Sequence, residues 1–266
     1  HLSIRRQRQM CIRDRLGGAK RQSARALTMI AGGTLDEEIE RAKSKQHEGF
    51  EAFKVKVGSL SAEQDLIRCS AIRKALGSSA FISADANEGY VPLQAAEFAK
   101  SAKEYGIDFF EQPVPAYDVS LIRDVASVSS VPLAADEGVH SQSDISELVS
   151  ASAVKGCSLK TIKLGGMLAV LDAARHAHSL GLNINLAGKV AETSISSSAV
   201  AVLACLVPNI NWDVSITNQY LETDPVTNSL AIENGCVVGP RGIGLGTQIE
   251  TVSYTHLRAH ETSLHL

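Results

Sequence analysis

The sequence predicts an α/β fold in which strands and helices alternate and close into a TIM-type barrel. Eight short apolar segments alternate with amphipathic segments of helical period between residues 16 and 250. Charged residues close five consecutive strands at intervals of 24 to 29 residues. A strand, a crossover helix and two short loops use roughly 25 to 30 residues and return the chain parallel to itself. The 266 residues, 44% of them hydrophobic, are enough for one large core.

The first elements of the chain show both the period of a strand and the period of a helix. A strand is expected at 27–31, and Thr34 is expected to cap the helix that follows, which has three acidic residues in its first turn. The second strand is expected at 50–57. Alternation along it places Lys54 and Lys56 on one face and apolar residues on the other. This pattern predicts a barrel strand whose outer face packs on helices.

The later elements follow the same alternation, with glycine or proline at most of their ends. Segment 230–250 is rich in glycine turns and has no evident partner within the barrel, so we expect it to have packed on a domain preceding residue 16. Helices are expected at 61–76, 92–105, 118–129, 143–152, 167–180 and 192–206, and strands at 81–85, 107–111, 131–135, 157–162, 182–186 and 210–215.

Composition excludes several classes of protein. A net charge of −3 gives no reason to expect nucleic acid or a membrane surface as partner, and no apolar run is long enough to span a bilayer. The five cysteines are scattered without a C-x-x-C pair, which is typical of thiols in a reducing cytosol. Residues 1–15 and 251–266 resemble translated adapter DNA. We expect both to be non-native extensions of a barrel that covers residues 16–250.

The charged residues that close the strands form the candidate site. Their order along the chain is Lys, Asp, Glu, Asp, Lys, and the carboxyl ends of barrel strands converge on one mouth. Three carboxylates from adjacent strands offer hard oxygen ligands, which suit Mg²⁺ or Mn²⁺. Such a cation stabilises the negative charge that develops when a proton leaves the carbon beside a carboxylate. The five residues are Lys56, Asp85, Glu111, Asp136 and Lys160.

The two lysines are candidates for the base that removes this proton. An ammonium with a pKa near 10.4 is inert at neutral pH, but repulsion from Lys54, a nearby dication and partial burial would each lower the pKa of Lys56. Lys160 follows the strand four places further round an eight-stranded barrel. We therefore expect Lys56 and Lys160 to face each other across the metal, one removing a proton and the other returning it.

Each of these residues also has a structural interpretation, because a single acid at a strand end most often caps a helix. Of the pair Asp136 and Glu137, spacing favours Asp136 as the ligand. Lys163 precedes two glycines and is interpreted as a surface or phosphate contact. Glu192 is interpreted either as a carboxylate at a helix N-terminus or as part of the site.

Together, the motifs Lys54-Val55-Lys56, Asp85-Ala86-Asn87, Glu111-Gln112-Pro113, Ala135-Asp136-Glu137 and Lys160 to Gly166 resemble the enolase superfamily in its muconate-lactonizing-enzyme-like subgroup. The resemblance covers residues 16–250. It implies a modified (β/α)7β barrel, Mg²⁺ held by Asp85, Glu111 and Asp136, and Lys56 with Lys160 as the acid/base pair. It also implies supporting or substrate-binding roles for Lys54, Asn87, Glu137, Glu192 and Asp213 or Ser215.

The resemblance implies an isomerase that abstracts the proton α to a carboxylate and forms an enolate. The outcome would be racemisation, epimerisation or cycloisomerisation of a small carboxylate or amino-acid derivative. A dehydratase, that is a lyase acting on a hydroxy acid or a hydroxyproline-like substrate, shares the first step and stays open. So does a non-catalytic barrel fragment, since the N-terminal α+β capping domain of the family is missing. The protein is expected to be cytoplasmic, and in its complete form to be a homo-oligomer.

Overall fold

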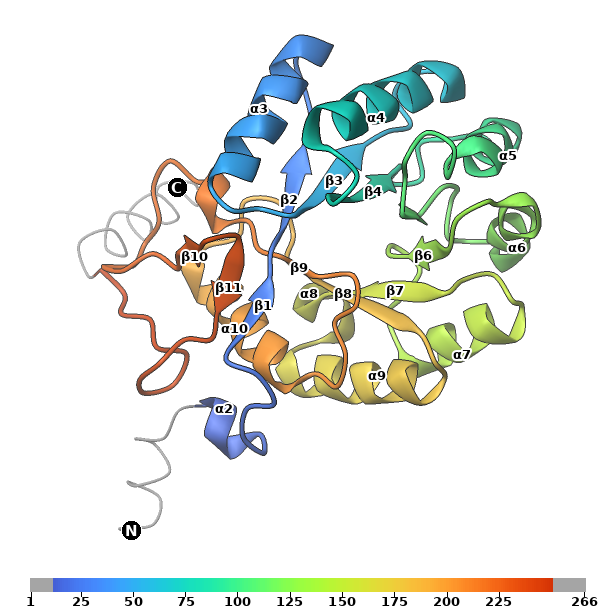
Figure 1. Ribbon diagram of the computed structural model, residues 1–266. Helices are drawn as coiled ribbons and strands as arrows, with labels where there is room; N and C mark the ends of the chain where they lie inside the picture. The colour runs from blue at the N-terminus through green and yellow to red at the C-terminus, as the bar shows by residue number, and fades with distance from the viewer. Residues whose placement is uncertain (1–11, 251–266) are drawn as a thin grey trace, which may run out of the picture.

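The computed structural model describes residues 12–250, and these form an eight-stranded parallel barrel surrounded by helices (Figure 1). The strands pair in chain order from β2 to β9, and a parallel bridge between Ala26 and Val214 brings the first and last strands together. This confirms the predicted TIM-type barrel. The barrel strands are β2 Leu27–Ile30, β3 Ala52–Lys56, β4 Phe81–Asp85, β5 Phe109–Glu111, β6 Leu133–Ala135, β7 Gly156–Leu159, β8 Asn183–Ala187 and β9 Val214–Ser215.

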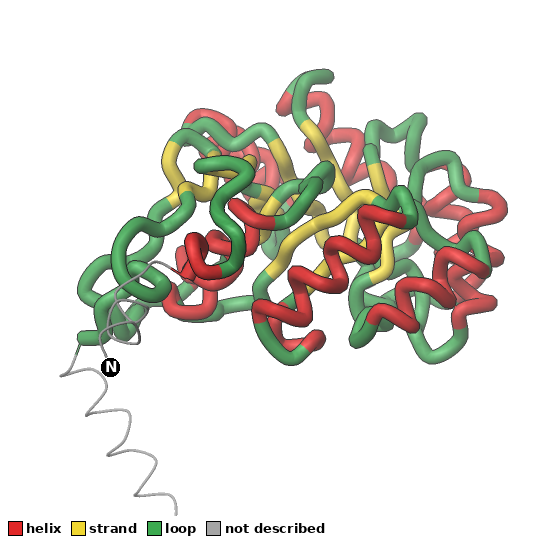
Figure 2. The backbone as a smooth tube through the Cα atoms, turned by 90° about the horizontal axis from the view of Figure 1, so that it is seen from below, coloured by secondary structure: helices red, strands yellow, loops and turns green. Residues whose placement is uncertain are grey.

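The helices form the outer layer of the barrel (Figure 2). Each of the seven strands from β2 to β8 is followed by at least one helix, whereas β9 is followed only by the 3₁₀ turn η1 Asn218–Tyr220. The architecture is therefore (β/α)7β, as expected. The helices are α3 Leu35–His47, α4 Ala62–Leu76, α5 Pro92–Ser101, α6 Val119–Val128, α7 Gln142–Ser150, α8 Thr161–Leu164, α9 Met167–Ser179 and α10 Ser194–Leu206.

Local sequence explains where the first helices begin. Thr34 caps α3 in a capping box, in which its hydroxyl accepts from the backbone N–H of Glu37 and the Glu37 carboxylate accepts from that of Thr34. Ser61 and Gln64 form the same arrangement at α4. Each box satisfies two N–H groups that a helix N-terminus leaves without partners. The predicted cap at Thr34 is confirmed.

Alternation along β3 sorts its side chains between two environments. Phe53 and Val55 are fully buried in the main apolar core between strands and helices. Lys54 and Lys56 point to the barrel interior, where both line a cavity. The predicted division of this strand into an apolar outer face and a charged inner face is confirmed.

Aromatic rings fill the interior at the amino-terminal end of the barrel. The Phe109 and Trp212 rings stack at 4.1 Å between centroids, and Phe81 lies 5.7 Å from Phe109. Gly156 leaves room for this stack, because a Cβ there would lie 2.1 Å from the Trp212 ring. The barrel is thus packed at this end, and its polar residues are concentrated at the other.

Several elements differ in extent from the expectation, and the strand expected at 210–215 is confined to Val214–Ser215. The strand expected at 157–162 ends at Leu159, because the chain turns into the short helix α8 directly after Lys160. Segment 230–250 was expected to have no partner within the barrel, and the partner it has lies outside the barrel sheet. In this segment β10 Ile232–Glu233 pairs with β11 Cys236–Val238, and β11 pairs with β1 Ser23–Arg25 in an antiparallel sheet beside the barrel.

The chain before the barrel also packs on it. The helix α2 Ile12–Arg15 contacts α10, and the backbone N–H of Ile12 donates to the carbonyl of Gly244. The rest of the predicted extensions, residues 1–11 and 251–266, lies outside the described residues. Between residues 12 and 250 no disulfide joins the cysteines. No helix in that range has the length and apolar composition to cross a bilayer.

Candidate active site

The five charged residues that close the strands lie together at the carboxyl end of the barrel. Lys56, Asp85 and Glu111 are the last residues of β3, β4 and β5, and they pair in register across these strands. Asp136 and Lys160 directly follow β6 and β7. Five consecutive strands therefore deliver two amines and three carboxylates to one end of the molecule.

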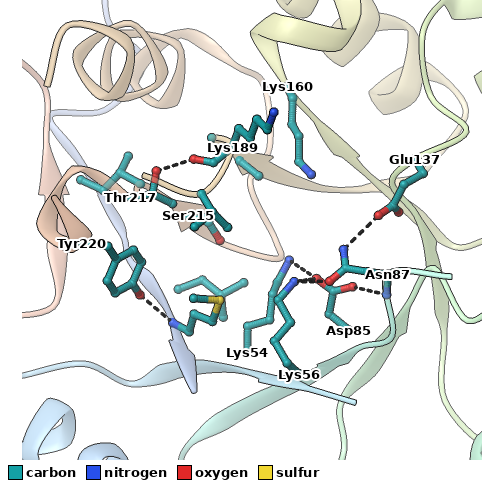
Figure 3. Close-up of a pocket in the computed structure, with 16 residues that line it drawn as sticks. Lys54, Lys56, Asp85, Asn87, Glu137, Lys160, Lys189, Ser215, Thr217 and Tyr220 are labelled. Carbon is teal, nitrogen blue, oxygen red and sulfur yellow. Dashed lines mark hydrogen bonds and ion pairs between the residues drawn. The ribbon is translucent and has the colours of Figure 1, made fainter. Parts of the chain in front are cut away.

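A cavity of about 430 Å³ opens at this end (Figure 3). In Figure 3, Lys54 and Lys56 enter from one side and Lys160 from the side opposite, and Lys189 lies on the side of Lys160. Polar and apolar residues share the wall, which suits a small organic anion. The lining residues are Leu27, Met29, Lys54, Lys56, Asp85, Asn87, Glu137, Lys160, Ala187, Gly188, Lys189, Val190, Ser215, Ile216, Thr217 and Tyr220.

Lysines hold the carboxylates of β4 and β5. The Lys54 ammonium lies 2.5 Å from Glu111 Oε2 and 3.6 Å from Asp85 Oδ2. Burial lowers the pKa of Lys54, but the charges of Glu111 and Asp85 more than offset this and raise it above the ordinary value. Lys56 donates to Asp85 Oδ2 at 2.6 Å and to Asn87 Oδ1 at 2.5 Å. Lys54 is thus a permanent cation between two acids.

Two further lysines meet at Asp136. Lys160 donates to Asp136 Oδ2, and Lys163 donates to Oδ1 at 2.7 Å. Burial raises the pKa of Asp136, but Lys163 and Lys160 together lower it to about 2. The interpretation of Lys163 as a surface contact was wrong: α8 turns its side chain back under the strand ends, where its side chain is only 12% exposed.

Glu111 is fully buried and depends on interior polar groups that the sequence did not single out. Its Oε1 accepts from the Ser158 hydroxyl at 2.6 Å, and Ser158 lies 3.1 Å from Asn185 Oδ1. Asn185 in turn donates to the carbonyls of Trp212 and Asp213. Burial raises the pKa of Glu111 above its ordinary value, against the opposing charge of Lys54. A hydrogen-bonded line therefore runs across the barrel from β3 to β9.

Asn87 and Glu137 extend the site on the surface side. The Asn87 amide donates to Glu137 Oε1 at 2.9 Å while its oxygen accepts from Lys56. Glu137 Oε2 is buried without a hydrogen-bond partner among the described residues. Burial and the charge of Asp136 raise the pKa of Glu137. Sequence spacing favoured Asp136 over Glu137 as the metal ligand. In the structure Asp136 contacts Lys160 and Lys163, whereas Glu137 contacts Asn87.

Two residues just after the ends of β4 and β5 have a strained backbone conformation. Asn87 and Gln112 have φ values of 42° and 37°, in the left-handed region that non-glycine residues rarely adopt. Gln112 is buried, and its side-chain oxygen accepts from the backbone N–H of Asp136 at 2.8 Å. This contact fixes the end of β6 against the end of β5. Strained residues of this kind cluster at functional sites.

The three carboxylates have the chemistry of a hard-cation site but are not gathered around one point. Among residues 12–250, no group of three or more His, Cys, Asp or Glu side chains is arranged to hold a metal ion. Each of Asp85, Glu111 and Asp136 is instead paired with lysine. In chemical type the donor set still fits a divalent cation, because all three residues supply the carboxylate oxygens that hard cations prefer.

Not every residue proposed for the site reaches the cavity. Ser215 lines it, whereas Asp213 is buried at the start of β9 and makes a two-point ion pair with Arg25 at 2.9 Å. Glu192 does not line the cavity; its Oε2 accepts from Ser196 one turn further along α10. Lys189 and Tyr220 line it and were not predicted. Lys189 lies on a loop and Tyr220 on the 3₁₀ turn η1, and no sequence period marks a residue in such segments as facing inward.

Comparison with known proteins places this geometry in a family. The model of the enolase C-terminal domain-like family matches residues 37–252. Chloromuconate cycloisomerase of Cupriavidus necator is 28% identical over 252 residues, which cover 93% of this chain and 67% of that protein. Hydrophobic dipeptide epimerase of Enterococcus faecalis is 31% identical over 194 residues, which cover 73% of this chain and 54% of that protein.

Solved structures agree with these matches. Muconate lactonizing enzyme from Pseudomonas putida superposes with a TM-score of 0.88 at 26% identity, covering 93% of this chain and 70% of that one. Muconate cycloisomerase from Pseudomonas fluorescens has the same fold, with a TM-score of 0.89 at 24% identity. The relatives reported above are isomerases by name, and the chain belongs to the enolase superfamily through its C-terminal-domain-like barrel.

Proposed function

We propose that this chain abstracts the proton α to a substrate carboxylate with the help of Mg²⁺ and returns a proton to the resulting enolate. The outcome is racemisation, epimerisation or cycloisomerisation of a small carboxylate. The observation that carries the proposal is the placement of Lys56 and Lys160. Lys56 ends β3 and Lys160 directly follows β7, four strands apart in a ring of eight, and both line one cavity.

This placement supports two-base chemistry. A substrate lying between the lysines presents one face of its α-carbon to Lys56 and the opposite face to Lys160. One amine takes the proton, and the other ammonium donates one to the far face, which inverts the centre. In a cycloisomerisation only one lysine changes its protonation state at that carbon.

Asp85, Glu111 and Asp136 would hold the divalent cation, whose charge stabilises the negative charge of the enolate. Lys54 and Lys163 then remain as fixed positive charges beside Glu111 and Asp136. Asn87 orients the Lys56 ammonium through its side-chain oxygen. Mg²⁺ fits this oxygen set, and Mn²⁺ shares its ligand preference.

Two other functions follow from the same residues. A dehydratase uses the same first step and then expels a β-hydroxyl, for which Glu137 and its unpartnered buried oxygen offer an acid beside the cavity. A barrel that binds but does not react is the remaining alternative. A measurement of proton transfer distinguishes a catalytic barrel from one that only binds its ligand.

Exchange of the substrate α-proton with solvent deuterium tests the proposal. In D₂O with MgCl₂, we expect loss of the α-proton NMR signal from muconolactone or from hydrophobic dipeptides, the substrates that the names of relatives suggest. Chelation by EDTA abolishes the exchange. Lys56→Met and Lys160→Met each abolish exchange from one enantiomer or epimer, whereas Lys74→Met, on the exposed end of α4, leaves it intact.

Absence of exchange in every compound with either Mg²⁺ or Mn²⁺ contradicts the proposal. A lysine variant that still exchanges the α-proton of both enantiomers or epimers contradicts the assignment of the bases. Release of water from a β-hydroxy acid, with rates that fall in Glu137→Gln, would instead support the dehydratase.

A further inference from the structure

Lys189 lies in the loop between β8 and α10 and is a further lysine that lines the cavity. Its backbone is fixed: the Thr217 hydroxyl donates to the Lys189 carbonyl at 2.5 Å, and the N–H of Gly188 donates to the carbonyl of Ser215 at 2.9 Å. In Figure 3 the side chain extends on the side of the cavity from which Lys160 enters. The position of Lys189 is thus set by β9, although its side chain is exposed.

Lys189 differs from the other lysines of the site in having no partner. Among residues 12–250, no hydrogen bond or ion pair involves its ammonium group, whereas each of the other four lysines contacts a carboxylate. The site as a whole sets five ammonium groups against four carboxylates. The ammonium groups are those of Lys54, Lys56, Lys160, Lys163 and Lys189, and the carboxylates those of Asp85, Glu111, Asp136 and Glu137.

An exposed lysine is most often solvated, but two features set this one apart. The loop that carries it is bonded to β9, so the backbone of Lys189 is fixed beside the cavity that the residue lines. The walls lower the local dielectric and strengthen the attraction of an unpaired positive charge for an anion. The cavity also has an apolar part, formed by Leu27, Met29 and Ile216. A ligand with two anionic ends and an apolar middle matches this distribution.

We propose that Lys189 binds a second anionic group of the substrate, distinct from the carboxylate next to the reacting carbon. The inference rests on the proposed function, since it concerns a substrate held between Lys56 and Lys160. It makes the preferred substrates dianions, with a second carboxylate as the simplest case. Lys189 is a specificity residue in this proposal and takes no part in proton transfer.

Three ligands of one length test the inference without turnover. Glutarate, pentanoate and 4-aminobutyrate share a carboxylate and three methylene groups and end in a carboxylate, a methyl group or an ammonium. We expect calorimetry to show glutarate binding about tenfold more tightly than pentanoate, and 4-aminobutyrate more weakly than either. In Lys189→Met the preference for glutarate falls to about twofold or less.

Two variants sharpen the comparison. Lys189→Glu inverts the order of glutarate and 4-aminobutyrate, because the loop then carries a negative charge. Lys74→Met removes an exposed lysine at the other end of the barrel and keeps the wild-type preference. Circular dichroism confirms that each variant is folded. Succinate and adipate, measured in the same way, give the spacing between the two anionic groups.

The inference is overturned if wild type binds glutarate no more tightly than pentanoate, or if Lys189→Met keeps the wild-type ratio. These binding results are obtained with and without MgCl₂ and do not depend on α-proton exchange. Failure of exchange alone therefore rejects the proposed function, whereas an unchanged ratio in Lys189→Met rejects only the role of Lys189.

Discussion

Ser158 shows how much of the site depends on a single buried hydroxyl. It donates to the buried carboxylate of Glu111, and a hydrogen bond to a buried charged group contributes about 1.5–3 kcal/mol. We expect Ser158→Ala to lower the free energy of unfolding by that amount in urea titrations. Ser83→Ala is the matched control, because Ser83 is equally buried and its hydroxyl has no partner among the described residues. Equal losses in the two variants would contradict this role.

The buried thiols of Cys69 and Cys157 predict a pH dependence of stability. Burial raises the pKa of each thiol to about 12, against about 8.5 in an unfolded chain. Between these values the folded state binds more protons, so stability is full below pH 8.5 and falls as pH rises.

For each thiol this amounts to about 2 kcal/mol between pH 8 and pH 10. We expect Cys157→Ala to reduce the difference in unfolding free energy between these two pH values by that amount. Val200→Ala also removes buried atoms, but no titratable group, and should lower stability equally at both values. A Cys157→Ala protein with the wild-type pH dependence would disprove the assignment.

At the residue scale, the charged residues of the site could be predicted from the sequence, because each closes a strand and they recur at regular intervals. Ser158 and Asn185 were not predicted, although both alternate with outward-facing residues on their strands. A small polar residue inside a strand has no distinct pattern. The burial of Lys163 was not predicted, because the sequence after Lys160 does not distinguish the helical turn α8 from a continuing strand. It is this turn that buries the Lys163 side chain.

At the scale of elements, a buried cluster joins the loops that follow β3 and β4. Asp65 Oδ2 on α4 accepts from the Tyr90 hydroxyl at 2.6 Å and from the backbone N–H of Gly58 at 2.8 Å. Arg68 also donates to Asp65 and to the carbonyl of Lys56. These contacts hold the strand ends that carry Lys56 and Asp85.

Removing the Tyr90 hydroxyl should loosen this connection. We expect Tyr90→Phe to lower the free energy of unfolding by about 1.5–3 kcal/mol, because Asp65 is a buried charged acceptor. Tyr105→Phe, at a half-buried tyrosine whose hydroxyl has no bond to a described residue, should change it by less than about 0.5 kcal/mol. Urea unfolding of both variants measures the difference, and a Tyr90→Phe protein as stable as Tyr105→Phe would exclude the connection.

The positions of elements could be predicted where a helix-capping residue stands directly before a segment of helical period, as Thr34 does before α3. They were not readable at residues 157–162, where β-branched residues continue past the strand into α8. A period of a few residues cannot separate a strand from one helical turn. The helical turn itself was set by the tertiary contacts of Lys163.

At the scale of the whole molecule, the barrel followed from the repeated βα interval, but the small sheet beside it did not. β1 and β11 pair although more than 200 residues separate them, and no local pattern marks that partnership. Gly235 meets Gly49 so closely that a Cβ at Gly235 would lie 2.0 Å from the Gly49 carbonyl oxygen. Contacts of this kind join segments that are far apart in the sequence, so no local pattern predicts them.

The central proposal also concerns the whole barrel. It states that three strand ends share one divalent cation between two opposed lysines. Anomalous diffraction from crystals grown with MnCl₂ measures this directly. We expect one Mn²⁺ peak bonded to Asp85, Glu111 and Asp136, with Lys56 and Lys160 on opposite sides of it. Mn²⁺ bound elsewhere, or absent while the three carboxylates stay paired with their lysines, would contradict the proposal.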